Sequence, residues 1–109
     1  MYLNEHLKTL NKILMNDIDQ NFYDRADEHI NLSNDQLESV SQGKVSASMM
    51  YSAARFNAWI SATGWNNREE MKSAKDETLD YFVTEYRKML DEKLDDYINN
   101  FNDYMDQKK

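Results

Sequence analysis

The sequence of 109 residues contains no cysteine, no proline and only two glycines, Gly43 and Gly64. Without cysteine, the chain forms neither disulfides nor thiolate metal sites. Two glycines 21 residues apart do not build a phosphate-binding loop, and the lack of proline removes the strongest helix breaker. The apolar runs are a few residues long, whereas a spanning helix needs roughly 20. We therefore expect a soluble, cytoplasmic, helical protein with no membrane segment.

Negative charge dominates the C-terminal part of the sequence. The whole chain carries a net charge of −7, and residues 76–107 contain ten acidic and three basic residues. Such a surface repels phosphate backbones, so we expect no nucleic-acid partner. The acidic stretch is interpreted as a solvated helix face, or alternatively as a docking face for a basic partner.

The apolar pattern divides the chain into two parts. Residues 1–16 have leucines at spacings of four, three and four, which predicts a peripheral N-terminal helix or extension, and Met15 offers an alternative start of translation. Residues 17–109 are predicted to form a single helical domain. The fold class expected is all-α: a mainly antiparallel bundle of three long helices plus a short N-terminal helix.

Turn and cap signals place these three helices. The first is expected over 17–42, with Gly43 as a left-handed residue at its C-terminus. The second is expected to begin after an N-cap at Ser46 and to stop at Gly64. The third begins at a capping box, in which Asn67 is the N-cap and Glu70 the third helical residue. Nothing in the sequence interrupts this helix before residue 105.

One face of the third predicted helix carries an apolar series with spacings of four, three, four, four, three, four and three, close to a coiled-coil seam. Its members are Leu79, Val83, Tyr86, Leu90, Leu94, Tyr97, Phe101 and Tyr104. The helix is longer than its expected neighbours, so the apolar residues of its last turns need a partner. Either the N-terminal helix covers them or a second copy does. We favour the second copy and predict a homodimer interface formed by Tyr97, Ile98, Phe101, Tyr104 and Met105.

A second candidate site surrounds Arg55, an arginine in the most apolar segment. Tyr51 and Trp59 are each four residues from Arg55 and share its helix face. A buried arginine needs a carboxylate or an aromatic ring. The sequence therefore predicts either a buried ion pair or a pocket for a small anion. The residues expected at this site are Arg55, His29, Tyr51, Trp59, Asp24 and Asp27.

The sequence contains no recognisable catalytic or metal-binding motif. His29 and His6 lack the carboxylate three residues earlier that a di-iron helix bundle needs, and they form no paired zinc motif. No serine, histidine and acid are found at a motif-like spacing. We therefore predict no catalytic residue, no metal and no cofactor.

Two stretches, residues 22–32 and 43–59, have distinctive sequences, and a C-terminal pattern includes Tyr81-Phe82, Tyr86-Arg87, Met89-Leu90 and Asp95-Asp96-Tyr97-Ile98-x-x-Phe101. Together they resemble a family of short bacterial proteins, mostly proteobacterial, called domain of unknown function 3144. The resemblance extends over about residues 18–105. It implies a bacterial source and a small stand-alone protein, and it assigns no activity and no functional residues.

These observations favour a non-enzymatic interaction or adaptor protein that binds another protein through its acidic, aromatic-rich C-terminal helix. The alternative is a helical bundle that binds a small ligand in a pocket around Arg55. An exposed apolar stripe on the C-terminal helix would favour the first, and an enclosed cavity at Arg55 would favour the second.

Overall fold

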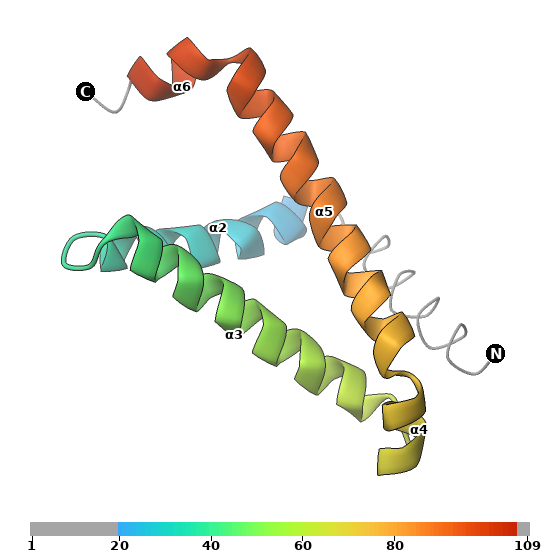
Figure 1. Cartoon of the computed structure of the whole chain (residues 1–109). Helices are drawn as coiled ribbons and strands as arrows, with labels where there is room; N and C mark the ends of the chain where they lie inside the picture. The colour runs from blue at the N-terminus through green and yellow to red at the C-terminus, as the bar shows by residue number, and fades with distance from the viewer. Residues whose placement is uncertain (1–19, 107–109) are drawn as a thin grey trace. The chain divides into compact units, whose positions relative to one another are not determined.

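The computed structural model describes residues 20–106 and contains α-helices and no strand within that range (Figure 1). The predicted all-α class is therefore confirmed, while the predicted N-terminal helix over 1–16 lies outside the described residues. The chain divides into two units, residues 1–73 and 74–109. The helices are α2 (Gln20–Gln36), α3 (Gln42–Thr63), α4 (Arg68–Ser73), α5 (Lys75–Asn99) and α6 (Phe101–Asp106).

In the first unit, α2 and α3 are consecutive helices that contact each other and are joined by a short turn (Figure 1). Two backbone hydrogen bonds connect this turn to the end of α2. The amide of Leu37 donates to the carbonyl of Ser33 at 3.1 Å, and the amide of Val40 donates to the carbonyl of Gln36 at 3.0 Å. These bonds satisfy carbonyls that the end of a helix leaves without partners. The first predicted helix therefore ends at Gln36 and not near residue 42.

The start of α3 differs from the prediction. Its N-cap is Ser41, which has extended backbone angles, and not Ser46. Gly43 lies inside the first turn with no positive φ, so the left-handed cap predicted at Gly43 is wrong. A glycine within a helix costs only about 1 kcal/mol relative to alanine. The additional helical turn places Val45, 5% exposed, in a buried position, and the burial of a valine contributes about 1.5–3 kcal/mol.

The connection from α3 to α4 agrees with the predicted stop and cap. Gly64 ends α3, with φ −88° and ψ −5°. The side-chain oxygen of Asn67 then accepts the amide of Glu70 at 2.9 Å. The Glu70 carboxylate accepts the amide of Asn66 at 2.9 Å, one residue earlier than in the usual capping box. The N-terminus of α4 is therefore fixed by two reciprocal hydrogen bonds among neighbouring residues.

The third predicted helix is interrupted twice, so the prediction of a continuous helix to residue 105 is wrong. Ala74, with φ −89° and ψ −5°, separates α4 from α5. Asn100, with φ −120° and ψ 31°, separates α5 from α6, which turns away from the axis of α5 (Figure 1). The side-chain nitrogen of Asn100 donates to the carbonyl of Asp96 at 3.1 Å. This bond to the backbone explains the second interruption, because asparagine competes for carbonyls that the helix uses.

Few of the described residues are buried: Val45, Ser61 and Ala74. Most large apolar side chains on α2, α3 and α5 keep substantial exposed area. Each of these helices therefore carries apolar side chains that remain largely accessible. None of the helices within residues 20–106 combines the length and the apolar character that crossing a membrane demands.

Candidate functional site

The most extended apolar feature of the second unit is one face of α5. We call it the α5 seam and define it by six residues whose spacings of four, three, four, four and three keep them on one side of the helix. Each is between 42% and 56% exposed. Single exposed apolar residues are common on protein surfaces, whereas a continuous row of them along one helix is not. Its members are Leu79, Val83, Tyr86, Leu90, Leu94 and Tyr97.

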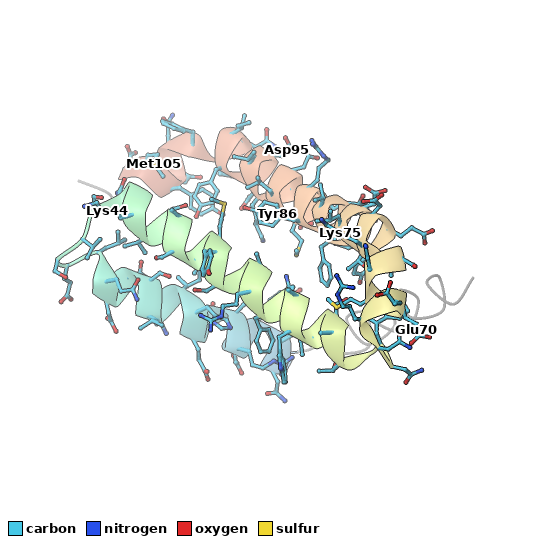
Figure 2. The ribbon with its side chains drawn as sticks, turned by 60° about the horizontal axis from the view of Figure 1, so that its bottom comes forward. Lys44, Glu70, Lys75, Tyr86, Asp95 and Met105 are labelled. Carbon is cyan, nitrogen blue, oxygen red and sulfur yellow. The ribbon has the colours of Figure 1, made fainter. Side chains whose placement is uncertain are left out.

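The acidic residues of α5 lie mainly away from the seam. Tyr86 and Asp95 project from opposite sides of the helix (Figure 2). At 3.6 residues per turn, Arg87 and Lys93 lie about 60° on either side of Leu90, next to the seam. Neither cation forms an ion pair with any residue in the described range. The seam is therefore an apolar row bordered near its middle by positive charge, on a helix whose charged residues are mostly acidic.

A hydrogen-bonded cluster joins α5 to α6. The Asp96 carboxylate accepts the side-chain amide of Asn100 at 3.0 Å and the hydroxyl of Tyr104 at 2.8 Å. The rings of Tyr97 and Tyr104 are 4.5 Å apart between centroids. Asp96, Asn100 and Tyr104 are spaced four residues apart, and Tyr97 and Tyr104 are seven residues apart. Their contacts therefore connect the two helices across the interruption at Asn100. We call this cluster the Asp96 junction.

Sequence reasoning missed the Asp96 junction as a unit, although it selected Tyr97 and Tyr104. The signal was present in the spacing of Asp96, Asn100 and Tyr104, which places the three side chains in successive turns. The hydrogen bond to Asp96, with the charge of that carboxylate, raises the pKa of Tyr104. Tyr104 therefore remains a neutral donor throughout the physiological range.

The structure leaves most of the predicted interface residues accessible. Ile98 is 69% exposed and Phe101 59% exposed, and Tyr97 and Tyr104 also keep exposed area. Met105 is half-buried. Tyr97 thus belongs to the α5 seam, while Phe101, Tyr104 and Met105 lie on α6. Their role in an interface stays a prediction.

The residues predicted around Arg55 lie on two helices: Tyr51, Arg55 and Trp59 on α3, and Asp24, Asp27 and His29 on α2. Tyr51, Arg55 and Trp59 lie along α3, all exposed, with Tyr51 at 68% and Trp59 at 60%. Arg55 forms no hydrogen bond or ion pair with any residue in the described range. The ring of Trp59 lies 6.0 Å from that of Phe56, on the same helix.

The α2 residues predicted at the same site, Asp24, Asp27 and His29, are exposed. Both the buried ion pair and the ligand pocket at Arg55 therefore stay predictions. Within residues 20–106, histidine and acidic side chains form no group of three that would hold a metal ion.

Two buried hydroxyls were not singled out by sequence reasoning. The side chain of Ser61 is 1% exposed, and its oxygen has no hydrogen-bond partner among residues 20–106. The hydroxyl of Tyr81 is also buried without a partner in that range. Burial, followed by the charge of Glu85, raises the pKa of Tyr81. No local pattern distinguishes Ser61 from the other small residues of α3, because burial depends on residues distant in sequence.

A protein-family model matches most of the chain. A model of the family described as protein of unknown function, DUF3144, matches residues 22–98, which is most of the sequence. The chain belongs to the DUF3144 family. The match is narrower than the expected resemblance over about 18–105, and it ends within α5. No curated protein and no solved structure matches the chain.

The DUF3144 match includes the whole α5 seam, from Leu79 to Tyr97. It stops before the interruption at Asn100, so α6 and the distal half of the Asp96 junction lie outside it. The family description assigns no activity. The α5 seam is thus a feature of the matched region, while Phe101, Tyr104 and Met105 belong to the part that follows it.

Proposed function

We propose that this DUF3144 protein is a non-enzymatic interaction protein that binds another protein chain through the α5 seam. The observation that supports the proposal is the continuous exposure of six apolar side chains along α5. Burying a fully exposed leucine or valine contributes about 1.5–3 kcal/mol. A row of six such residues, each about half exposed, therefore supplies several kcal/mol toward association.

The side chains of the seam suit recognition of protein. Two of the six, Tyr86 and Tyr97, are tyrosines, which combine a large apolar ring with a hydroxyl that stays hydrated at the rim. Tyrosine is enriched at protein interfaces, and charged residues are depleted at their centres. Arg87 and Lys93 border the row without entering it, which is the arrangement of an apolar centre with a polar rim.

The proposal extends to the fold. Besides the seam, α2 and α3 carry exposed apolar side chains, among them Ile30 at 50%, Phe56 at 61% and Trp59 at 60%. We propose that in the assembled protein α2, α3 and α5 form a mainly antiparallel bundle that buries these side chains of α2 and α3 and leaves the α5 seam to the partner chain. The exposed area of each helix supports this, because an amphipathic helix gains most of its stability by packing its apolar face.

The test expresses tagged forms of this protein as baits in cells that make the protein. It then compares the chains that each tagged form retains. Leu94→Glu places one negative charge in the seam. Thr84→Glu adds the same charge to an exposed position about 120° around α5 from Leu90, and serves as the matched control. Circular dichroism must first show equal helix content for both variants and the unmodified protein.

The proposal predicts that the unmodified bait and Thr84→Glu retain the same bound chains, including untagged copies of this protein, and that Leu94→Glu loses them. If Leu94→Glu retains the same chains in the same amounts, the seam is not the binding surface and the proposal fails.

A further inference from the structure

The spacing of the α5 seam is the same when read in either direction from Leu90. Toward the N-terminus the residues follow at four, three and four, at Tyr86, Val83 and Leu79. Toward the C-terminus they follow at four and three, at Leu94 and Tyr97, and the next step of four reaches Phe101, the first residue of α6. A surface with this symmetry is complementary to a second copy of itself that runs in the opposite direction.

We infer that the partner of the α5 seam is the α5 seam of a second copy, antiparallel, with the two-fold axis at Leu90. The inference rests on the proposed function, because it names the chain that the seam binds. In this arrangement Leu90 faces the second copy's Leu90, and Val83 faces the second copy's Tyr97. Tyr86 faces the second copy's Leu94. Each tyrosine thus lies opposite a smaller aliphatic side chain, which is the alternation that a packed interface requires.

The charges beside the seam agree with the same pairing. Arg87 and Asp91 lie on one side of the seam, about 60° and 100° from Leu90. A two-fold axis across antiparallel helices brings the same side of both helices together. At 1.5 Å per residue, Arg87 then lies within about 3 Å, along the axis, of the second copy's Asp91. The two-fold symmetry generates a second, identical pair between Asp91 and the second copy's Arg87. Within residues 20–106 of one chain, neither Arg87 nor Asp91 forms an ion pair.

The outer face of α5 also fits this arrangement. Glu77, Glu92 and Asp95 lie about 140° or more from Leu90, so they point away from the second helix. Each copy carries a net charge of −7, and this placement keeps most of the acidic residues of the two helices apart. The bordering cations, Arg87 and Lys93, are the charged groups closest to the axis.

The absence of cysteine from the sequence makes the geometry directly measurable. Three single variants are prepared in the full chain: Leu90→Cys, Val83→Cys and Tyr97→Cys. Each is treated with an oxidant and, separately, with a short bis-maleimide. The solution mass of the unmodified protein is measured in parallel by analytical ultracentrifugation.

The antiparallel pairing predicts that Leu90→Cys cross-links to itself, because the two thiols meet on the axis. Val83→Cys does not cross-link to itself, since the two thiols are about 21 Å apart along the helices. An equimolar mixture of Val83→Cys and Tyr97→Cys does cross-link. The unmodified protein has twice the 13.0 kDa mass of one chain. Leu90→Ala raises the dissociation constant of the dimer about 30-fold, because each dimer loses two leucine side chains at its centre.

Other results overturn the inference. Self-cross-linking of Val83→Cys as efficient as that of Leu90→Cys indicates a parallel pair. A solution mass of 13.0 kDa without cross-linking of Leu90→Cys indicates that another helix of the same chain or a different protein covers the seam. In that case, loss of bound chains from Leu94→Glu baits still supports the proposed function. Retention of those chains by Leu94→Glu rejects the proposed function itself.

Discussion

Replacement of Ser61 by alanine tests the consequence of a buried hydroxyl in α3. The Ser61 side chain is 1% exposed and its oxygen has no hydrogen-bond partner in residues 20–106. Burying a hydroxyl without a partner costs about 1–3 kcal/mol, since its hydrogen bonds to water are lost and not replaced. Alanine is almost the same size and has no hydroxyl. We therefore expect Ser61→Ala to increase the free energy of unfolding.

The size of the gain at Ser61 follows from three contributions. Removing the unpaired hydroxyl contributes about 1–3 kcal/mol, and the better helix propensity of alanine adds up to about 0.5 kcal/mol. The lost packing of one oxygen atom offsets about 0.5 kcal/mol. The net increase is about 0.5–3 kcal/mol. For a domain of this size, each kcal/mol raises the melting temperature by roughly 4–8 °C.

The assay is urea and thermal unfolding followed by circular dichroism, at one protein concentration for all variants, because self-association makes the midpoint depend on concentration. Ser52→Ala is the matched control: Ser52 lies in the same helix and is exposed. It gains the helix propensity of alanine without removing a buried hydroxyl. If Ser61→Ala stabilises the protein no more than Ser52→Ala does, the reasoning from burial is refuted.

Three further predictions concern local structure. Gly43→Ala should raise the free energy of unfolding by about 0.5–1 kcal/mol in urea titrations, because Gly43 is helical and an added Cβ meets no atom within 4 Å. Asn67→Ala should lower it by about 1 kcal/mol, since the cap on the Glu70 amide is lost, while Asn67→Ser should change it little. Tyr104 has a pKa raised above the ordinary value of about 10 by its hydrogen bond to Asp96, so this bond should persist to about pH 10 and be lost as the pH rises through the raised pKa. Ultraviolet titration of tyrosinate, as the difference between the protein and Tyr104→Phe, measures that pKa, and Asp96→Asn should lower it.

Each of these three predictions has a result that contradicts it. Destabilisation by Gly43→Ala would indicate the left-handed cap expected from sequence, and so would reject the helical start of α3 at Gln42. Equal stability of Asn67→Ala and Asn67→Ser would show that the 2.9 Å bond to the Glu70 amide contributes nothing measurable. An unchanged Tyr104 titration in Asp96→Asn would remove Asp96 as the cause of the raised pKa.

The helix class and the α5 seam were predictable because both depend on neighbours in sequence. A row such as Leu79, Val83 and Tyr86 follows the period of the helix, and that period is visible without knowing any other part of the chain. The cap at Asn67 was predictable for the same reason, since its two hydrogen bonds join residues no more than four apart. The fold class and the apolar row on α5 were therefore available from the sequence, although the interface predicted from the sequence shares only Tyr97 with the α5 seam.

The limits of the helices were less predictable. Ser41 and Ser46 are both acceptable N-caps, and the choice of Ser41 follows the burial of Val45, which sequence does not reveal. Ala74 is an excellent helix former, yet it separates α4 from α5 and is only 2% exposed. Differences of about 1 kcal/mol in local propensity are smaller than the contribution of one buried side chain, so packing decides where a helix begins and ends.

The sequence by itself determined the helical class, the acidic charge of the C-terminal part and the apolar face of α5, because composition and the 3.6-residue period are local properties. Only the tertiary structure decided that Ser61 is buried while Arg55 is exposed, although both lie in α3. The reason is that a side chain is buried by residues that are distant in sequence, and the pattern of a single helix does not specify which of its positions those residues cover.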